Sequence, residues 1–170
     1  MEQMFSDLEG LRVAMEIERR GFAFYKKAYE KFKDDQAKAL FKALMEEEEE
    51  HLKIFTGFFM ELEAKKEAHS IEYLFDPEIS RYLLVLAELH VFPLESETDR
   101  VIAGLDTVDK IIKLAMGAEK DSILLYTEME NNAKFDSSRE VFAKLKQEEH
   151  RHVVELSGRF KELLLERGLK

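Results

Sequence analysis

Two stretches of this 170-residue sequence repeat each other at an offset of 101 residues. FKALMEEEEEHLKIF begins at residue 41, and FAKLKQEEHRHVVEL begins at residue 142. Within these stretches the offset matches Glu48 with Glu149 and His51 with His152, and in the residues before them it matches Glu18 with Glu119 and Tyr25 with Tyr126, among other identical pairs. The repeat predicts a chain made of two related units.

Apolar residues recur at helical spacing through both units. They predict two long helices in each unit, which form hairpins over about residues 7–66 and 107–167. Ser6 and Glu9 are spaced as a capping box before the first helix, and Ser137 is expected to cap the last one. With only 7 Gly and 2 Pro, the chain is poor in turns, which favours long helices over many short strands.

A long connection, at about residues 67–106, joins the two hairpins. It contains Asp76 followed by Pro77, the pattern of an N-cap and a first helical residue, and then the apolar sequence ISRYLLVLAEL. This pattern predicts a short extra helix. The connection is long enough for the chain to travel back along the bundle. We therefore expect a single all-α domain over residues 1–170, a four-helix bundle with one long crossover.

The composition narrows the classes of function. The absence of cysteine excludes disulfides, thiolate metal sites and cysteine nucleophiles. The net charge of -10 disfavours binding to nucleic acid and to anionic lipid. No apolar run approaches the roughly 18 residues that span a bilayer, and the first ten residues do not resemble a signal peptide. We therefore expect a cytoplasmic protein that does not contact membranes.

Six titratable residues occupy positions on the apolar stripes, where core side chains are expected. They are one Glu on the first helix of each hairpin and a Glu-x-x-His pair on the second: Glu18, Glu48, His51, Glu119, Glu149 and His152. In each hairpin the two glutamates are equally distant from the predicted turn. Antiparallel packing therefore places them side by side, and the internal symmetry brings all six residues to one level of the bundle.

Six such groups in a core without water need partners of opposite charge or hydrogen bonds, because burying an unpaired carboxylate costs several kcal/mol. Four carboxylates and two neutral imidazoles balance the charge of two divalent cations. Ligand sets of oxygen and nitrogen without sulfur suit iron or manganese, and this arrangement is the ligand pattern of di-iron four-helix bundles. The alternative interpretation is a buried ion-pair network without metal.

At these residues the sequence resembles the rubrerythrin branch of the ferritin-like superfamily. The matching motifs are Glu18-x-x-Gly21-x-x-x-Tyr25, Leu44-x-x-x-Glu48-x-x-His51, Glu119-x-x-Ser122-x-x-x-Tyr126 and Leu145-x-x-x-Glu149-x-x-His152. The stretches DPEISRYLLVLAELHVF and EKDSILLY resemble rubrerythrin-related proteins as well. The resemblance covers nearly the whole chain and implies a ferritin-like fold.

The resemblance also implies a role for each motif residue. Glu48 and Glu149 would bridge two iron ions, with manganese or a mixed pair as alternatives. The ligands assigned to a single ion are Glu18, His51, Glu119 and His152. We expect Tyr25 and Tyr126 to act in the reaction by hydrogen bonding to ligands or by supplying electrons. The alternative is that both tyrosines are core residues with a satisfied hydroxyl.

Two features depart from rubrerythrins. Rubrerythrins carry a four-cysteine rubredoxin site, which a chain without cysteine cannot build. They also place a further Glu where this chain has Ser122. We therefore expect a non-haem di-iron oxidoreductase that reduces peroxide or dioxygen with electrons from an external donor, such as a rubredoxin-type protein.

The alternative function is oxidation of ferrous iron for iron binding or detoxification. A non-catalytic helical interaction module is disfavoured by the inward Glu and His residues.

The apolar residues Leu83, Leu84 and Leu86 of the crossover are expected to pack on the bundle or on a second subunit, so we expect a homodimer. Apart from Glu48, the glutamates at 46–50 are expected to form a solvated helix face. Three histidines are expected at the surface or around the ligands: His69, His90 and His150.

Overall fold

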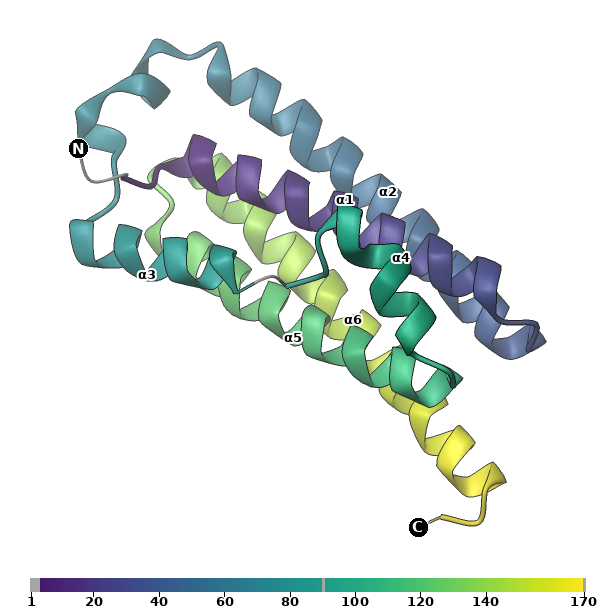
Figure 1. The fold of residues 1–170 in the computed structure, drawn as a ribbon. Helices are drawn as coiled ribbons and strands as arrows, with labels where there is room; N and C mark the ends of the chain where they lie inside the picture. Colours follow the sequence, from purple (N-terminus) through teal and green to yellow (C-terminus); the bar gives the residue numbers. More distant parts are fainter. Residues whose placement is uncertain (1–3, 90, 170) are drawn as a thin grey trace.

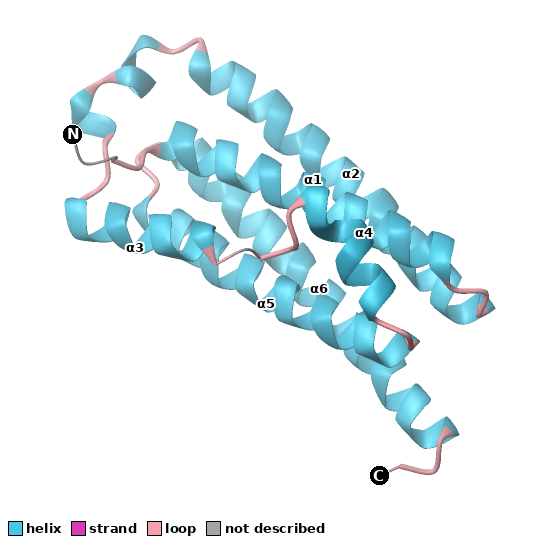
Figure 2. Cartoon of the chain, in the orientation of Figure 1, coloured by secondary structure: helices cyan, strands magenta, loops and turns pink. Residues whose placement is uncertain are grey.

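The regular structure of this chain is helical, as a computed structural model of residues 4–89 and 91–169 shows (Figures 1 and 2). The described α-helices are α1 (Asp7–Lys31), α2 (Asp35–Glu63), α3 (Pro77–Glu88), α4 (Glu95–Gly104), α5 (Val108–Asn132) and α6 (Asp136–Glu166). Two short 3-10 helices precede α3: η1 (Lys66–His69) and η2 (Ile71–Tyr73). The predicted all-α fold is confirmed.

Four long helices form the bundle as two antiparallel hairpins. Helix α1 packs along α2, and α5 packs along α6. The crossover returns the chain to the end of the bundle at which α2 began, so α5 runs parallel to α2 (Figure 1). The C-terminal end of α6 extends beyond the neighbouring helices (Figure 1). The predicted four-helix bundle with one long crossover is therefore confirmed.

The crossover contains the predicted helix and a second helix that the sequence did not indicate. Helix α3 begins at Pro77 after the Asp76 N-cap, as predicted, and packs against α5. Helix α4 packs against α1, and its sequence, ESETDRVIAG, has too few apolar residues to show a helical stripe. Leu83 is fully buried and Leu84 and Leu86 are partly buried against the core, so these residues cover the bundle.

The helix starts show which capping predictions hold. The Ser6 side chain accepts a hydrogen bond from the backbone N–H of Glu9, as predicted for α1. The prediction of Ser137 as the cap of α6 is wrong, because the helix begins at Asp136. There the carboxylate of Asp7, at the start of α1, accepts hydrogen bonds from the backbone N–H groups of Lys134 and Phe135. A residue from another helix thus satisfies two backbone donors just before α6, whose N-cap residue, Phe135, makes no side-chain capping bond.

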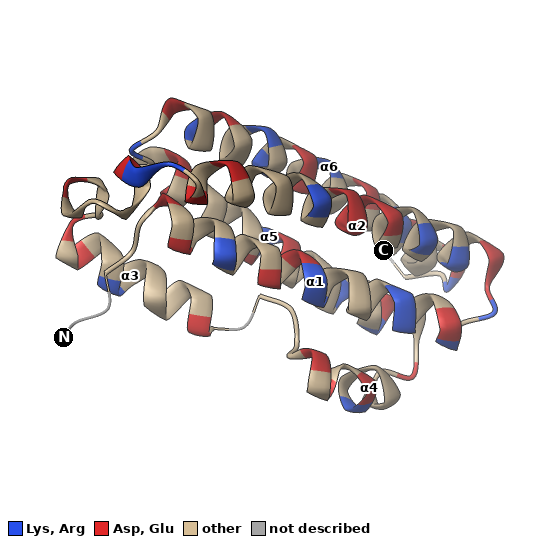
Figure 3. Cartoon of the chain, turned by 90° about the horizontal axis from the view of Figure 1, so that it is seen from above, with Lys and Arg blue, Asp and Glu red and all other residues tan. Residues whose placement is uncertain are grey.

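The core repeats the symmetry of the sequence. The rings of Tyr25 and Phe41 in the first hairpin have centroids 6.4 Å apart, and those of Tyr126 and Phe142 in the second are 6.3 Å apart. Charged residues of both signs recur along the helices (Figure 3). None of the helices in the described part of the chain combines the length and apolar composition of a membrane span. The aromatic packing of the core is therefore equivalent in the two hairpins.

Candidate metal centre

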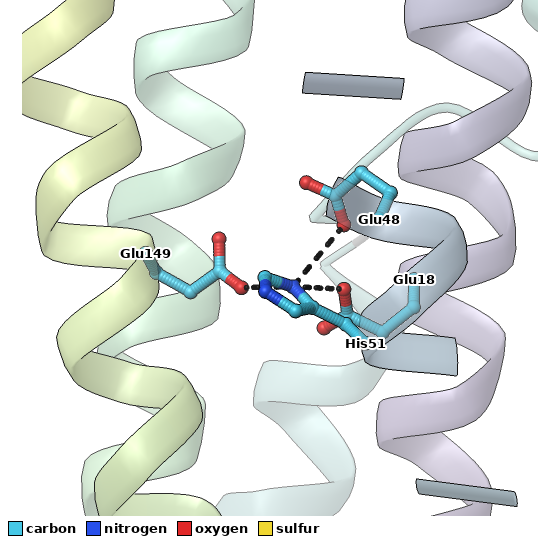
Figure 4. Close-up of side chains that lie close together, drawn as sticks. All are labelled: Glu18, Glu48, His51 and Glu149. Atoms are coloured by element: carbon cyan, nitrogen blue, oxygen red, sulfur yellow. Dashed lines mark hydrogen bonds and ion pairs between the residues drawn. The ribbon is translucent and has the colours of Figure 1, made fainter. Parts of the chain in front are cut away.

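All four long helices contribute to one buried cluster of carboxylates and imidazoles. Glu18 comes from α1, Glu48 and His51 come from α2, Glu119 comes from α5, and Glu149 and His152 come from α6. Each of these residues is at most 1% exposed. Figure 4 shows Glu18, Glu48 and Glu149 gathered around the ring of His51. The structure therefore brings together all six residues that the sequence predicts as metal ligands.

The cluster divides into two overlapping groups that could each hold a metal ion. Their members are Glu18, Glu48, His51 and Glu149 in the first group and Glu48, Glu119, Glu149 and His152 in the second. In each group, one ligand atom from every residue lies within 4.8 Å of the others. Only Glu48 and Glu149 belong to both. This overlap is what two bridging carboxylates and two sets of terminal ligands require.

Both histidines point one nitrogen into the cluster and the other out of it. The inward Nδ1 of His51 lies 3.2 Å from Glu18 Oε2 and 3.1 Å from Glu149 Oε1. Its outward Nε2 lies 2.6 Å from Glu148 Oε2. In His152, Nδ1 lies 3.0 Å from Glu149 Oε2. A carboxylate at Nε2 favours the proton there, which leaves the lone pair on Nδ1 directed at the metal positions.

The outward contact of His152 is made by Glu47. Its Nε2 lies 2.6 Å from Glu47 Oε2, which also accepts a hydrogen bond from Arg151 at 2.9 Å. Glu47 and Glu148 were not predicted as part of the site, and the expectation that Glu47 faces only solvent is wrong. The offset of 101 pairs Glu47 with Glu148, so the repeat contained the signal that identifies them. Each outer carboxylate contacts the histidine of the opposite hairpin.

The two tyrosines make equivalent crossed contacts. The Tyr25 hydroxyl of α1 donates a hydrogen bond to Glu119 of α5, and the Tyr126 hydroxyl of α5 donates one to Glu18 of α1. Burial, followed by the charge of the accepting glutamate, raises the pKa of each tyrosine well above its usual value. Both hydroxyls therefore keep their protons and hold the terminal carboxylates in orientation. The other sequence-predicted histidines lie elsewhere: His69 and His150 are exposed, and His90 lies outside the described residues.

The pKa values of the ligands show that the metal-free cluster retains protons. Burial, together with the charges of neighbouring glutamates, raises the pKa of Glu48 well above its usual value. Burial and the charge of Glu149 raise the pKa of Glu119 to about 8. Burial alone would lower the pKa of His51, but Glu149 and Glu18 raise it to about 11, and carboxylates raise that of His152 in the same way. Glu149 differs, because the two imidazoles overcome its burial and lower its pKa.

The polar atoms left without partners test whether a metal pair fits this cluster. Glu48 Oε1, Glu119 Oε2, both carboxylate oxygens of Glu149 and Nδ1 of His152 are buried and make no contact with hydrogen-bond geometry. The approaches of Glu149 to the two Nδ1 atoms at 3.1 and 3.0 Å are ion-pair contacts only. Buried polar atoms in this state are costly unless another group satisfies them. They all belong to residues of the two overlapping groups, and they are oxygen and nitrogen donors of the kind that iron and manganese prefer. The residues therefore fit a dinuclear metal centre.

We predict that Glu148→Ala weakens metal binding about ten- to hundredfold, because outer carboxylates orient ligating histidines. Without Glu148, the Nε2 proton of His51 loses the acceptor that fixes the ring. Competition with a colorimetric chelator measures the affinity. Glu49→Ala is the matched control, since Glu49 is an exposed residue of the same acidic run and its carboxylate pairs with Lys53. Equal affinities in the two variants would contradict the assigned role of Glu148.

Comparisons with known proteins bear on the fold and on the family of this chain. A crystal structure from Thermotoga maritima, described as a ferritin-like diiron-carboxylate protein, superposes with a TM-score of 0.72 at 24% identity, over 95% of this chain and 99% of that one. A hypothetical protein from Pyrococcus furiosus superposes with a TM-score of 0.65 at 23% identity, over 98% of this chain and 94% of that one. These likenesses show the fold. No curated protein matches this chain significantly. The model of the rubrerythrin family matches residues 9–164, and the chain therefore belongs to the rubrerythrin family.

Proposed function

We propose that this protein is a non-haem di-iron oxidoreductase that reduces peroxide or dioxygen with electrons from a donor external to the chain. One observation carries the proposal: two buried ligand groups share the carboxylates of Glu48 and Glu149. Membership of the rubrerythrin family supports iron as the metal, with manganese or a mixed pair as the alternative. A ferrous pair, when bound, supplies the two electrons that reduction of one peroxide to two water molecules requires.

The residues of the chain prepare the site for this chemistry. His51 and His152 present Nδ1 to the metal positions while Glu148 and Glu47 hold Nε2. Protonated tyrosine hydroxyls hold the terminal glutamates, and the apolar core around them limits the access of bulk water. These contacts orient the terminal carboxylates and the two imidazoles toward the metal positions. We propose that the electrons come from a rubredoxin-type protein, because a chain without cysteine cannot form a four-cysteine iron site itself.

The test is metal analysis of anaerobically purified protein, followed by stopped-flow oxidation with peroxide and with dioxygen in parallel. We expect about two iron ions per chain. The reduced protein should consume roughly one peroxide per site and then stop until a donor is added, because two irons hold two electrons for this reaction. Reduced rubredoxin should restart the reaction.

Other outcomes would contradict the proposal in recognisable ways. Sustained peroxide consumption with release of dioxygen, in the absence of any donor, would identify a disproportionating enzyme. Repeated oxidation of added ferrous iron, with the product retained by the protein, would identify iron handling as the function. If the purified protein binds no transition metal under anaerobic conditions, neither the proposed oxidoreductase nor iron handling is its function.

A further inference from the structure

Gly21 lies against the carboxylate of Glu48, the glutamate shared by both ligand groups. It is buried inside α1, one turn after Glu18. A Cβ atom at this position would lie 3.1 Å from both Cδ and Oε2 of Glu48. It would also lie 3.1 Å from Cε2 of Phe92. These separations are closer than ordinary van der Waals contact between such atoms, so the carboxylate occupies space that any other residue would fill.

No other glycine in the described residues has this relation to the site. Gly10, also buried in α1, has its nearest neighbours at 3.4 Å, in the side chains of Met129 and Phe142. For Gly57 in α2 and Gly117 in α5, an added Cβ would meet no atom within 4 Å. Glycine is unfavourable inside a helix. At residue 21 the structure shows what the glycine provides, which is close approach of a ligand to the helix backbone.

Phe92 determines which neighbour would move if a methyl group were added at residue 21. Its ring is 1% exposed and comes from the segment between α3 and α4. It packs against Phe24 and Tyr25, with ring centroids 5.5 and 5.7 Å away. A ring enclosed in this way yields less readily than the end of a glutamate side chain. The Glu48 carboxylate is therefore the group that an added methyl would displace.

We propose that Gly21 is a positioning residue, whose missing side chain keeps open the space in which the Glu48 carboxylate lies between the two metal positions. The inference rests on the proposed dinuclear function and adds a residue that touches neither metal position. Oε1 of Glu48 lies 3.5 Å from Nδ1 of His152, and Oε2 lies 4.0 Å from Nδ1 of His51. The carboxylate thus faces both halves of the site, and a displacement of a few tenths of an ångström would disturb its bridging position.

The experiment compares cobalt binding by wild-type protein, Gly21→Ala and Gly10→Ala. Metal-free protein is titrated with Co²⁺ in competition with a colorimetric chelator, and elemental analysis gives the ions retained after dialysis. We expect Gly21→Ala to weaken binding of the second ion about ten- to hundredfold, with a smaller effect on the first. Gly10→Ala adds the same methyl group to the same helix against core residues only, and it should bind both ions as wild type does.

Two further measurements distinguish displacement of Glu48 from a general loss of stability. They are urea unfolding of the metal-free proteins and metal binding by a compensating variant. Alanine favours the helix, so metal-free Gly21→Ala should remain folded by circular dichroism. In Gly21→Ala combined with Phe92→Leu, the smaller side chain lets the backbone of α1 shift toward residue 92 by a few tenths of an ångström, which carries the methyl group away from Glu48. Binding of the second ion should then recover at least in part. If Gly21→Ala binds two ions with wild-type affinity, or the double variant shows no recovery, the inference is wrong. If wild-type protein binds no metal, the proposed function fails instead.

Discussion

Replacing Glu48 and Glu149 together with alanine should reduce the bound metal from about two ions per chain to none, because these residues belong to both ligand groups. Each group would keep one carboxylate and one imidazole, and two ligands do not hold a transition metal against a chelator. Elemental analysis of protein purified anaerobically with ferrous iron measures the stoichiometry. Circular dichroism establishes that the variant remains a helical bundle.

The single variants give the matched comparison. Glu18 and Glu119 each belong to one group, so replacing either with alanine should weaken one metal position and leave the other with its four ligands. Replacing Glu48 or Glu149 alone should remove more metal than either of these changes. Full occupancy by two ions in the Glu48→Ala, Glu149→Ala double variant would show that the centre lies elsewhere in the protein.

Metal-free and metal-loaded protein should respond in opposite directions when the pH rises from 5 to 7. In the metal-free fold, the pKa of Glu119 is raised to about 8 and that of His51 to about 11, both above the unfolded values. The folded state therefore binds more protons than the unfolded state. Each extra proton lowers the free energy of unfolding by roughly 1.4 kcal/mol per pH unit as the pH rises. Metal-free protein should thus lose stability across this window.

In the metal-loaded protein, the ligand carboxylates are ionised and the imidazoles are neutral, so the unfolded chain binds more protons until its histidines titrate near pH 6.5. Loaded protein should therefore gain stability from pH 5 to 7. The lowered pKa of Glu149 has an effect only where the pH falls below the usual glutamate value, outside this window. Urea titrations at several pH values measure both slopes. A metal-free protein that also gained stability would show that these groups do not share protons in a buried site.

The buried cluster of glutamates and histidines was predictable because helical periodicity and the internal repeat constrain it independently. The 3.6-residue period places Glu48 and His51 on one face, and the offset of 101 predicts Glu149 and His152 from them. Helix α4 was not predictable in this way. Its polar sequence forms a helix in contact with α1, and such tertiary contacts override weak local signals.

Contacts between elements explain the remaining differences. Glu47 belongs to a run of five glutamates, and periodicity alone assigns it to the solvated face. Only the packing of α2 against α6 brings its carboxylate to His152. Likewise, the function of Gly21 depends on atoms from α2 and from the segment after α3, which no local pattern reveals. Ser137 was expected as a cap because the sequence does not show that Asp7 reaches the start of α6.

The crossed contacts bear on how such a chain can arise. One hairpin alone carries three of the clustered residues, but the hydroxyl and the outer carboxylate that contact its terminal glutamate and its histidine come from the other hairpin. Two identical hairpins related by a twofold axis would supply these groups to each other. A gene for a single hairpin could therefore encode a complete centre as a homodimer, and its tandem duplication would preserve every crossed contact. Fusion then allows the halves to diverge, as Gly21 and Ser122 at equivalent positions already have.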